Sequence, residues 1–561
     1  SACLCHMKHL TYLLLLCLSG PILRAQLTDS QMAQIDSIFM DWNQPNFPGG
    51  SVAIEIDGTI VYNKAFGLAS LEYLVPNNTG TVYNIASVSK QFTSMGILLL
   101  EKEGKLSVKD DIRKYLPELP DFGTPITIEH LMHHTSGLRS LHAMLEMAGW
   151  RWDDSRDNDD LWRFMQRQKE LNFPPGEEYL YCNTGYILMA LIIERLTEES
   201  FRDWMQTHVF EPLNMPNTYV EDVYYSVMPG NATSYYGAEA NDFARAVEYW
   251  GYVGSGNIHS TTADLLNWQQ NYYAPASGWS SLFAKMETEG ILNNGESTHY
   301  GYGIGIREFL GRKLVSHSGA IGGFRSVATT FPQEQTDIII LSNFSASNVG
   351  GKAREIAAIL FPEDQEAEIE TPAPAREPIS LSTKQMSRFE GWYWTEEFML
   401  ARHVYLQNDT LFFGRPSGTR TSMLIPISEN SFYLAGREDI VLTFEGKGKN
   451  KVMQIQEGQF HATYEIFELP QIDATYLAQY AGNYYSEELD TYYQLYEREG
   501  ELYGYHARHG EFAVSVVKDN ALRTENGAVQ FILAQRGTKD EVVSLRITNG
   551  RVRNAYFKKV E

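Results

Sequence analysis

The stretch Ser87-Val88-Ser89-Lys90, inside a longer run from Tyr83 to Phe92, decides the fold of the first part of this chain. Apolar residues recur after it at helical spacing, at Phe92, Met95, Leu98 and Leu99. This periodicity predicts a helix that begins at Ser87, where free backbone N–H groups favour a developing negative charge. Lys90 follows one turn later and lies on the same face. A lysine so placed can activate a serine hydroxyl, so we expect Ser87 to be a nucleophile.

The Ser-x-x-Lys pattern occurs a second time, at Ser515 and Lys518. Around this copy, Phe512, Val514 and Val516 alternate with other residues, which predicts a β-strand. In a strand, Ser515 and Lys518 point to opposite faces, so we do not expect them to work together.

The length of 561 residues allows two to four domains, each with its own core. A segment rich in acidic residues and proline predicts a linker over 363–383, between a first domain at 26–362 and the rest of the chain.

Beyond this linker the sequence contains short aromatic alternations separated by turn residues, and it repeats itself. The run 389–393 matches 480–484, and Gly391 and Gly482 lie 91 residues apart. The repeat predicts two small antiparallel β-barrels, at 384–470 and 471–561. We expect their aromatic side chains to fill the cores; the alternative is a carbohydrate- or peptide-binding role.

The first 25 residues resemble a signal peptide, with Lys8 before a short apolar core from Leu10 to Leu18 and a cleavage site near Ala25. We therefore expect a secreted or periplasmic protein with no stable membrane anchor. Cleavage would remove three of the four cysteines and leave Cys182 alone, so no internal disulfide is expected.

The formal net charge is −24, which argues against nucleic acid as a partner. The adjacent pair His133-His134 lacks the ligand spacing of a metal site, and neighbouring residues of a helix face different ways. A structural turn is the better interpretation of this pair. We expect neither a metal nor an organic cofactor.

Two further motifs follow Ser87-x-x-Lys90 in the chain: Tyr181-x-Asn183, and His317-Ser318-Gly319. In this order and spacing the three motifs resemble those of the serine β-lactamase and penicillin-binding protein superfamily. The matching branch has Tyr-x-Asn as its second motif and includes class C β-lactamases, D,D-carboxypeptidases, esterases and D-aminopeptidases. The resemblance covers about residues 31–360. It implies an α+β fold, an antiparallel sheet flanked by helices.

The resemblance also implies a role for each site residue. Ser87 would attack the scissile carbonyl, and Lys90 and Tyr181 would share the general base and acid work, with either one as the base. Asn183 would bind the substrate or hold Lys90. The backbone N–H groups of Ser87 and Ala320 would form the oxyanion hole. Gly319, by lacking a Cβ, would let the substrate lie against an edge strand.

The third motif departs from the pattern of most penicillin-interactive enzymes, which have Lys where this chain has His317. A histidine is mostly neutral at pH 7, so the fixed positive charge for a substrate carboxylate is missing. A His-x-Gly motif resembles that of D-aminopeptidases and some esterases. D-aminopeptidases also carry two small barrels after the first domain, the layout that the 91-residue repeat predicts here.

We therefore expect a D-aminopeptidase-like serine hydrolase that acts on a small molecule or short peptide through an acyl-enzyme. One alternative is a promiscuous esterase, or a weak β-lactamase or D,D-peptidase. A second alternative is a non-catalytic ligand-binding protein. The intact set of Ser87, Lys90 and Tyr181 argues against the latter, because a receptor needs no activated nucleophile.

Overall fold

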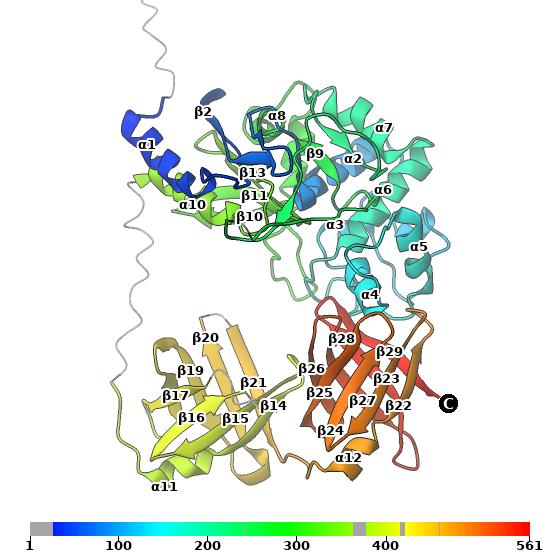
Figure 1. Cartoon of the computed structure of the whole chain (residues 1–561), viewed down its shortest axis with the longest axis vertical. Helices are drawn as coiled ribbons and strands as arrows, with labels where there is room; N and C mark the ends of the chain where they lie inside the picture. Colours follow the sequence, from blue (N-terminus) through cyan, green and yellow to red (C-terminus); the bar gives the residue numbers. More distant parts are fainter. Residues whose placement is uncertain (1–25, 241, 363–376, 416–420, 459) are drawn as a thin grey trace, which may run out of the picture.

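The computed structural model describes residues 26–240, 242–362, 377–415, 421–458 and 460–561, arranged as an N-terminal α+β domain above two β-barrels (Figure 1). The expected signal peptide and most of the expected linker lie outside these residues. Within the described ranges, no helix has both the length and the apolar composition needed to cross a membrane.

A six-stranded antiparallel sheet organises the N-terminal domain. Its first two strands form the hairpin that the turn residues Asp57 and Gly58 predict, both with positive φ (50° and 67°). The central strands are buried along almost their whole length, because helices cover both faces. In spatial order the strands are β10 (Gly305–Phe309), β11 (Arg312–Ile321), β12 (Phe324–Phe331), β13 (Thr336–Ser342), β1 (Gly50–Ile56) and β2 (Thr59–Phe66).

Two helices distant in sequence, α1 (Asp29–Ile38) and α10 (Val349–Leu360), pack together and build an apolar core with one face of the sheet. The opposite face packs on α8 (Thr262–Gln269) and the helical part of the domain (Figure 1). The remaining α-helices are α2 (Lys90–Lys102), α3 (Ile128–Met132), α4 (Leu141–Met147), α5 (Asn158–Arg167), α6 (Asn183–Thr197), α7 (Phe201–Met205) and α9 (Ser280–Met286).

The first C-terminal domain is a closed eight-stranded antiparallel barrel, which confirms the predicted barrel. It is preceded by the short helix α11 (Thr383–Met386) and has its own apolar core. Its strands are β14 (Gly391–Thr395), β15 (Leu400–Gln407), β16 (Thr410–Gly414), β17 (Ser422–Pro426), β18 (Ser431–Leu434), β19 (Arg437–Glu445), β20 (Val452–Glu457) and β21 (Phe460–Phe467).

The second C-terminal domain is another closed eight-stranded barrel, preceded by the helix α12 (Ala474–Ala478). The expected strand around Ser515 and Lys518 is one of its strands, β25. The strands are β22 (Gly482–Ser486), β23 (Thr491–Arg498), β24 (Glu501–His506), β25 (Gly510–Lys518), β26 (Ala521–Asn526), β27 (Val529–Arg536), β28 (Val542–Asn549) and β29 (Val552–Val560).

The 91-residue repeat has a structural basis at the first strand of each barrel. Gly391 and Gly482 begin these strands with φ of 149° and 154°, a conformation that favours glycine. Two residues later, Tyr393 donates a 2.7 Å hydrogen bond to a main-chain oxygen four residues earlier, and Tyr484 does the same. The repeated glycine and tyrosine thus give the first strand of each barrel the same backbone conformation at its start.

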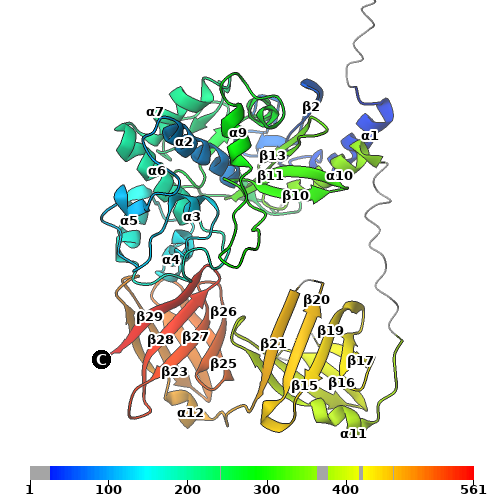
Figure 2. The same cartoon turned by 180° about the vertical axis from the view of Figure 1, so that it is seen from behind.

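The second barrel is attached to the N-terminal domain through a continuous apolar core, whereas the first barrel is not. Tyr493 of β23 donates a 2.8 Å hydrogen bond to the main-chain oxygen of Met147 in α4. Figure 2 shows the turn between β28 and β29 directly below the helical part of the N-terminal domain. Among the described residues, six ion pairs join the two domains: Arg139–Glu488, Arg167–Asp490, Lys169–Glu487, Arg508–Asp154, Arg546–Glu170 and Arg553–Glu178.

Candidate active site

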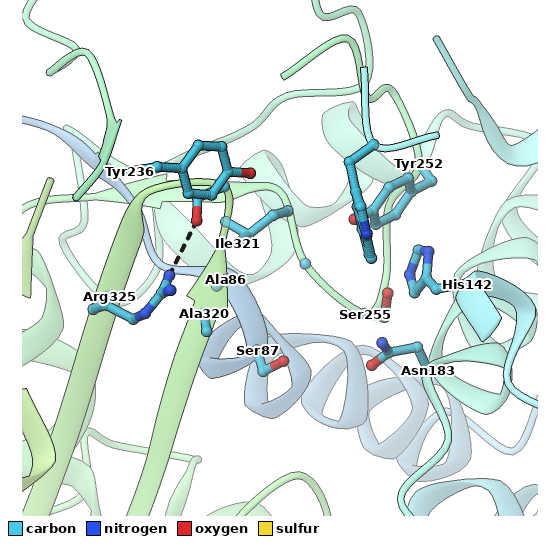
Figure 3. A pocket seen from close by; sticks show the side chains of 13 residues that line it. Ala86, Ser87, His142, Asn183, Tyr236, Tyr252, Ser255, Ala320, Ile321 and Arg325 are labelled. Atoms are coloured by element: carbon cyan, nitrogen blue, oxygen red, sulfur yellow. Dashed lines mark hydrogen bonds between the residues drawn. The ribbon is translucent and has the colours of Figure 1, made fainter. Parts of the chain in front are cut away.

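Ser87 opens onto a cavity of about 510 Å³ between the sheet and the helical part of the domain. Figure 3 shows Ser87 and Asn183 facing each other at the base of the cavity, with Ala320 beside Ser87. Aromatic side chains form much of its wall. The cavity is lined by Ala86, Ser87, His142, Trp152, Asn183, Tyr236, Tyr252, Ser255, Gly256, Ala320, Ile321, Gly322 and Arg325.

Ser87 lies in a 3₁₀ turn, Ala86–Ser89, and α2 begins only at Lys90, later than the periodicity predicts. The tight turn arises because Asn84 accepts a 2.9 Å hydrogen bond from the Ala86 N–H, which holds Ala86 at a φ of 49°. A non-glycine residue in this region of φ is strained, and such strain is often found at functional sites. The turn still leaves Lys90 on the same side as Ser87.

Lys90 is completely buried, and its Nζ lies 3.0 Å from the Oγ of Ser87. The same nitrogen donates a 2.7 Å hydrogen bond to the main-chain oxygen of Ser255. Burial lowers the pKa of Lys90 well below its usual value, and the positive charge of Arg551 lowers it further. This shift favours the neutral amine, which is the form that can take a proton from the Ser87 hydroxyl.

Tyr181 lies beside this pair, with Lys90 Nζ 4.9 Å from the centre of its ring and the ring of His134 4.2 Å away. Burial raises the pKa of the Tyr181 phenol, and the nearby Ser87 hydroxyl opposes this shift. The phenol therefore stays protonated at neutral pH. Its oxygen makes no direct hydrogen bond to any described residue, so it is available as a proton donor to a substrate.

Asn183 is the first residue of α6, and its side chain points into the cavity (Figure 3). Its Oδ1 is buried without a hydrogen-bond partner in the part of the chain that the structure describes. It therefore does not hold Lys90 in this state. An unpaired buried amide oxygen is costly, and a substrate N–H would satisfy it.

The third motif lies on β11, whose pairing with β10 ends at Ser316. Within the described sheet, the following residues, from His317 to Ile321, have no strand partner on that side. Packing within the protein also requires a glycine at position 319. A Cβ there would lie 2.4 Å from the main-chain oxygen of Ile85. Glycine thus lets β11 approach the segment before Ser87, which brings Ala320 beside the nucleophile.

His317 does not line the cavity that contains Ser87. Its Nε2 lies 2.9 Å from the Tyr300 hydroxyl and its Nδ1 lies 2.7 Å from the main-chain oxygen of Ser318, so both ring nitrogens are occupied. Burial, followed by the charge of Lys90, lowers the pKa of His317 to about 3. The histidine is therefore uncharged at neutral pH. With Tyr181 it lines a second cavity of about 370 Å³.

Three residues near the site were not predicted as part of it: His134, Tyr300 and Arg551. His134 has a φ of 60° and accepts a 3.0 Å hydrogen bond from the Cys182 N–H, so it orders the segment that carries Tyr181. This agrees with the structural interpretation of the histidine pair. Among the described residues, no cluster of His, Cys, Asp or Glu could hold a metal ion.

The sequence matches a family model described as Beta-lactamase over residues 25–361. It is 29% identical over 425 residues to penicillin-binding protein 4* of Bacillus subtilis, covering 71% of this chain and 91% of that protein. It is also 25% identical over 472 residues to a D-aminopeptidase of Brucella anthropi, covering 82% of each chain.

Solved structures give the same result. An octameric penicillin-binding protein homologue from Pyrococcus abyssi superposes with a TM-score of 0.54 and 26% identity, covering 77% of this chain and 99% of that one. A D-amino acid amidase from Ochrobactrum anthropi superposes with a TM-score of 0.51 and 21% identity, covering 60% and 99%. The latter likeness shows the fold alone.

Proposed function

The chain belongs to the beta-lactamase family and is a serine hydrolase, and we propose that it cleaves small peptides, amides or esters through an acyl-enzyme on Ser87. The observation that carries this proposal is the 3.0 Å distance between Lys90 Nζ and Ser87 Oγ inside a cavity open to substrate. No metal is needed for this chemistry, because a neutral lysine can activate the hydroxyl.

Each catalytic step uses one of these groups. Lys90 takes the proton of Ser87 as Oγ attacks the carbonyl carbon, and the oxyanion faces the backbone N–H groups of Ser87 and Ala320. Tyr181 then gives its proton to the leaving group as the carbon–heteroatom bond breaks, and the Lys90 ammonium returns a proton to Tyr181. A water molecule attacks the acyl-enzyme in the second half, with the same groups acting in reverse.

A D-aminopeptidase is the first candidate for the specific activity. Its support is the similarity to proteins named D-aminopeptidase and the layout of two C-terminal barrels. In this proposal the enzyme is exported, on the strength of the apolar segment Leu10–Leu18, and acts on peptides that contain D-amino acids.

An esterase or a D,D-peptidase is the second candidate, and the lining of the cavity favours it. None of the described residues that line the cavity is acidic, and Arg325 is among them. A substrate ammonium group would meet a cation there instead of the carboxylate that an aminopeptidase needs. An acylated or neutral substrate would meet no such cost.

The test compares the parent protein with Ser87→Ala on D-alanine p-nitroanilide, N-acetyl-D-alanine p-nitroanilide, a p-nitrophenyl ester and a chromogenic cephalosporin. Turnover of the free anilide that disappears in the variant supports the aminopeptidase. Preference for the acetylated anilide or the ester supports the second candidate. Equal rates for parent and variant, or no turnover of any substrate, would overturn the serine mechanism in favour of a ligand-binding protein.

A further inference from the structure

The turn between β28 and β29 brings Arg551 from the second barrel to the active site. Ser140 donates its N–H to the main-chain oxygen of Arg551 at 3.2 Å, and Asn172 Nδ2 donates to the same oxygen at 3.1 Å. Asn172 Oδ1 also accepts the N–H of Arg553 at 2.8 Å. The backbone of the turn is therefore fixed on both sides of Arg551 by residues of the N-terminal domain.

The side chain of Arg551 extends to Tyr181, with its guanidinium carbon 5.0 Å from the centre of the tyrosine ring. This contact places the guanidinium over the ring, and Arg551 as a residue is exposed to solvent. Lys90 lies on the same ring, so two basic groups contact one tyrosine. Such crowding favours an anion between or beside them.

The other arginines at this domain interface have carboxylate partners, and Arg551 has none among the residues that the structure describes. Arg553 Nη1 lies 2.9 Å from Glu178, Arg546 Nη1 lies 2.6 Å from Glu170, and the buried Arg139 is paired with Glu488. These pairs hold the barrel in place. Arg551, which lies beside Tyr181, forms no such pair, so docking of the domains does not explain why this position carries a positive charge.

Arg551 contacts Tyr181, so the role of Tyr181 tells which part of a substrate would lie near Arg551. Because Tyr181 gives its proton to the leaving group, the leaving group must lie beside the phenol. Arg325 lines the cavity that contains Ser87, which neither Tyr181 nor Arg551 lines, and it donates to the main-chain oxygens of Gly322 and Phe324. His317 supplies no charge at neutral pH.

We propose that Arg551, supplied by the second barrel, binds a carboxylate on the leaving-group side of the substrate and thereby selects substrates with an anionic leaving group. This inference rests on the proposed acyl-enzyme function. The guanidinium can donate two parallel N–H bonds to a carboxylate, a geometry that a neutral or cationic leaving group cannot match. The cation that the third motif lacks is thus provided from another domain.

The test uses two aryl esters that differ only in the charge of the leaving group, 3-carboxyphenyl acetate and 3-carbamoylphenyl acetate. The full-length parent and Arg551→Gln are compared by the ratio of kcat/KM for the charged over the neutral ester. We expect this ratio to fall by about tenfold in Arg551→Gln, the size of a lost charge-assisted hydrogen bond. The two esters differ in intrinsic reactivity, but this difference is the same for both proteins and therefore cancels when their ratios are compared.

Two variants complete the design. Arg551→Lys keeps the positive charge but cannot donate two parallel N–H bonds. Its ratio of kcat/KM for the charged over the neutral ester should lie between those of Arg551→Gln and the parent. Arg553→Gln removes a positive charge from the same hairpin, but one paired with Glu178, and should leave the ratio at the parent value. The same ratio in Arg551→Gln and in the parent would overturn the inference while ester turnover by Ser87 stands. Absence of turnover of both esters by the parent would overturn the proposed function itself.

Discussion

The Nζ of Lys90 lies 4.9 Å from the centre of the Tyr181 ring, and burial shifts the pKa values of these two groups in opposite directions. The lysine is driven towards its neutral amine and the tyrosine is kept as a neutral phenol, because charge is costly in this buried site. Burial therefore favours the uncharged form of each group, in which an amine can accept a proton and a phenol can donate one. Ser87 lines the cavity, and its Oγ lies 3.0 Å from Lys90 Nζ.

The pH dependence of the reaction should report the protonation of Lys90. The value of kcat/KM for a neutral ester should rise with pH as Lys90 loses its proton and be constant above its pKa. Arg551→Gln removes a like charge, which raises the pKa of Lys90 and moves the acid limb to higher pH. The measurement is a pH–rate profile of both proteins. An acid limb that stays in place or moves to lower pH would contradict this assignment.

Replacement of the catalytic tyrosine should affect substrates according to their leaving groups. Tyr181→Phe removes the proton donor and should lower kcat for an anilide by about 10²–10⁴-fold. A p-nitrophenyl ester should lose much less, since nitrophenolate leaves without a proton. Steady-state rates on both substrates test this, and an equal melting temperature serves as the folding control. Equal losses on the two substrates would rule out a leaving-group role for Tyr181.

Gly319→Ala should damage the site through the backbone. Its new Cβ would lie 2.4 Å from the Ile85 main-chain oxygen and 2.4 Å from Ser326 Oγ, closer than atoms can approach. We expect β11 to move away from Ser87 and kcat to fall by about 10²-fold or more, because the donor at Ala320 is displaced. If the variant folds and retains the parent kcat, Ala320 does not provide an oxyanion donor.

The buried pair Arg139–Glu488 should be important for the docking of the second barrel. Their side chains are 1% and 4% exposed, so Glu488→Gln leaves a buried guanidinium whose remaining carboxylate, that of Glu170, lies 3.8 Å away. We expect a loss of about 3–5 kcal/mol of unfolding free energy. The exposed pair Arg508–Asp154 is the control, where Arg508→Gln should cost less than about 1 kcal/mol. Denaturant unfolding of both variants tests this; similar losses would show that burial is not the cause.

Asp337 should make the stability of the sheet depend on pH. It is fully buried in β13, where Thr330 and Tyr273 donate hydrogen bonds to it at 2.6 and 2.8 Å. Burial raises its pKa from 3.8 to about 7, so between these values the folded state binds more protons than the unfolded state. Stability should therefore decrease as pH rises from about 4 to about 7.

Asp337→Asn removes this titration and should flatten the dependence of melting temperature on pH across the same window. The variant keeps an acceptor for one hydroxyl, and the other hydroxyl can accept from the new amide. A curve as steep as that of the parent would show that another group controls the stability.

Features that depend on local spacing were predictable from the sequence. One helical turn separates Ser87 from Lys90, the apolar periodicity predicts α2, and the turn residues predict the first hairpin. The 91-residue repeat predicts the two barrels, because repeated glycine and tyrosine positions fix the same strand entry. The helix start at Lys90 was missed, since it depends on a side-chain bond from Asn84.

The sequence by itself predicted the candidate catalytic groups of this protein: the serine, the lysine one turn later, and the tyrosine and asparagine ahead of an apolar helix. The tertiary structure decided their protonation, because the pKa of Lys90 and that of Tyr181 depend on burial by residues far away in the chain. It also placed Arg551, from another domain, against the ring of Tyr181. Contacts between distant segments have no local pattern, since only packing of whole domains brings them together.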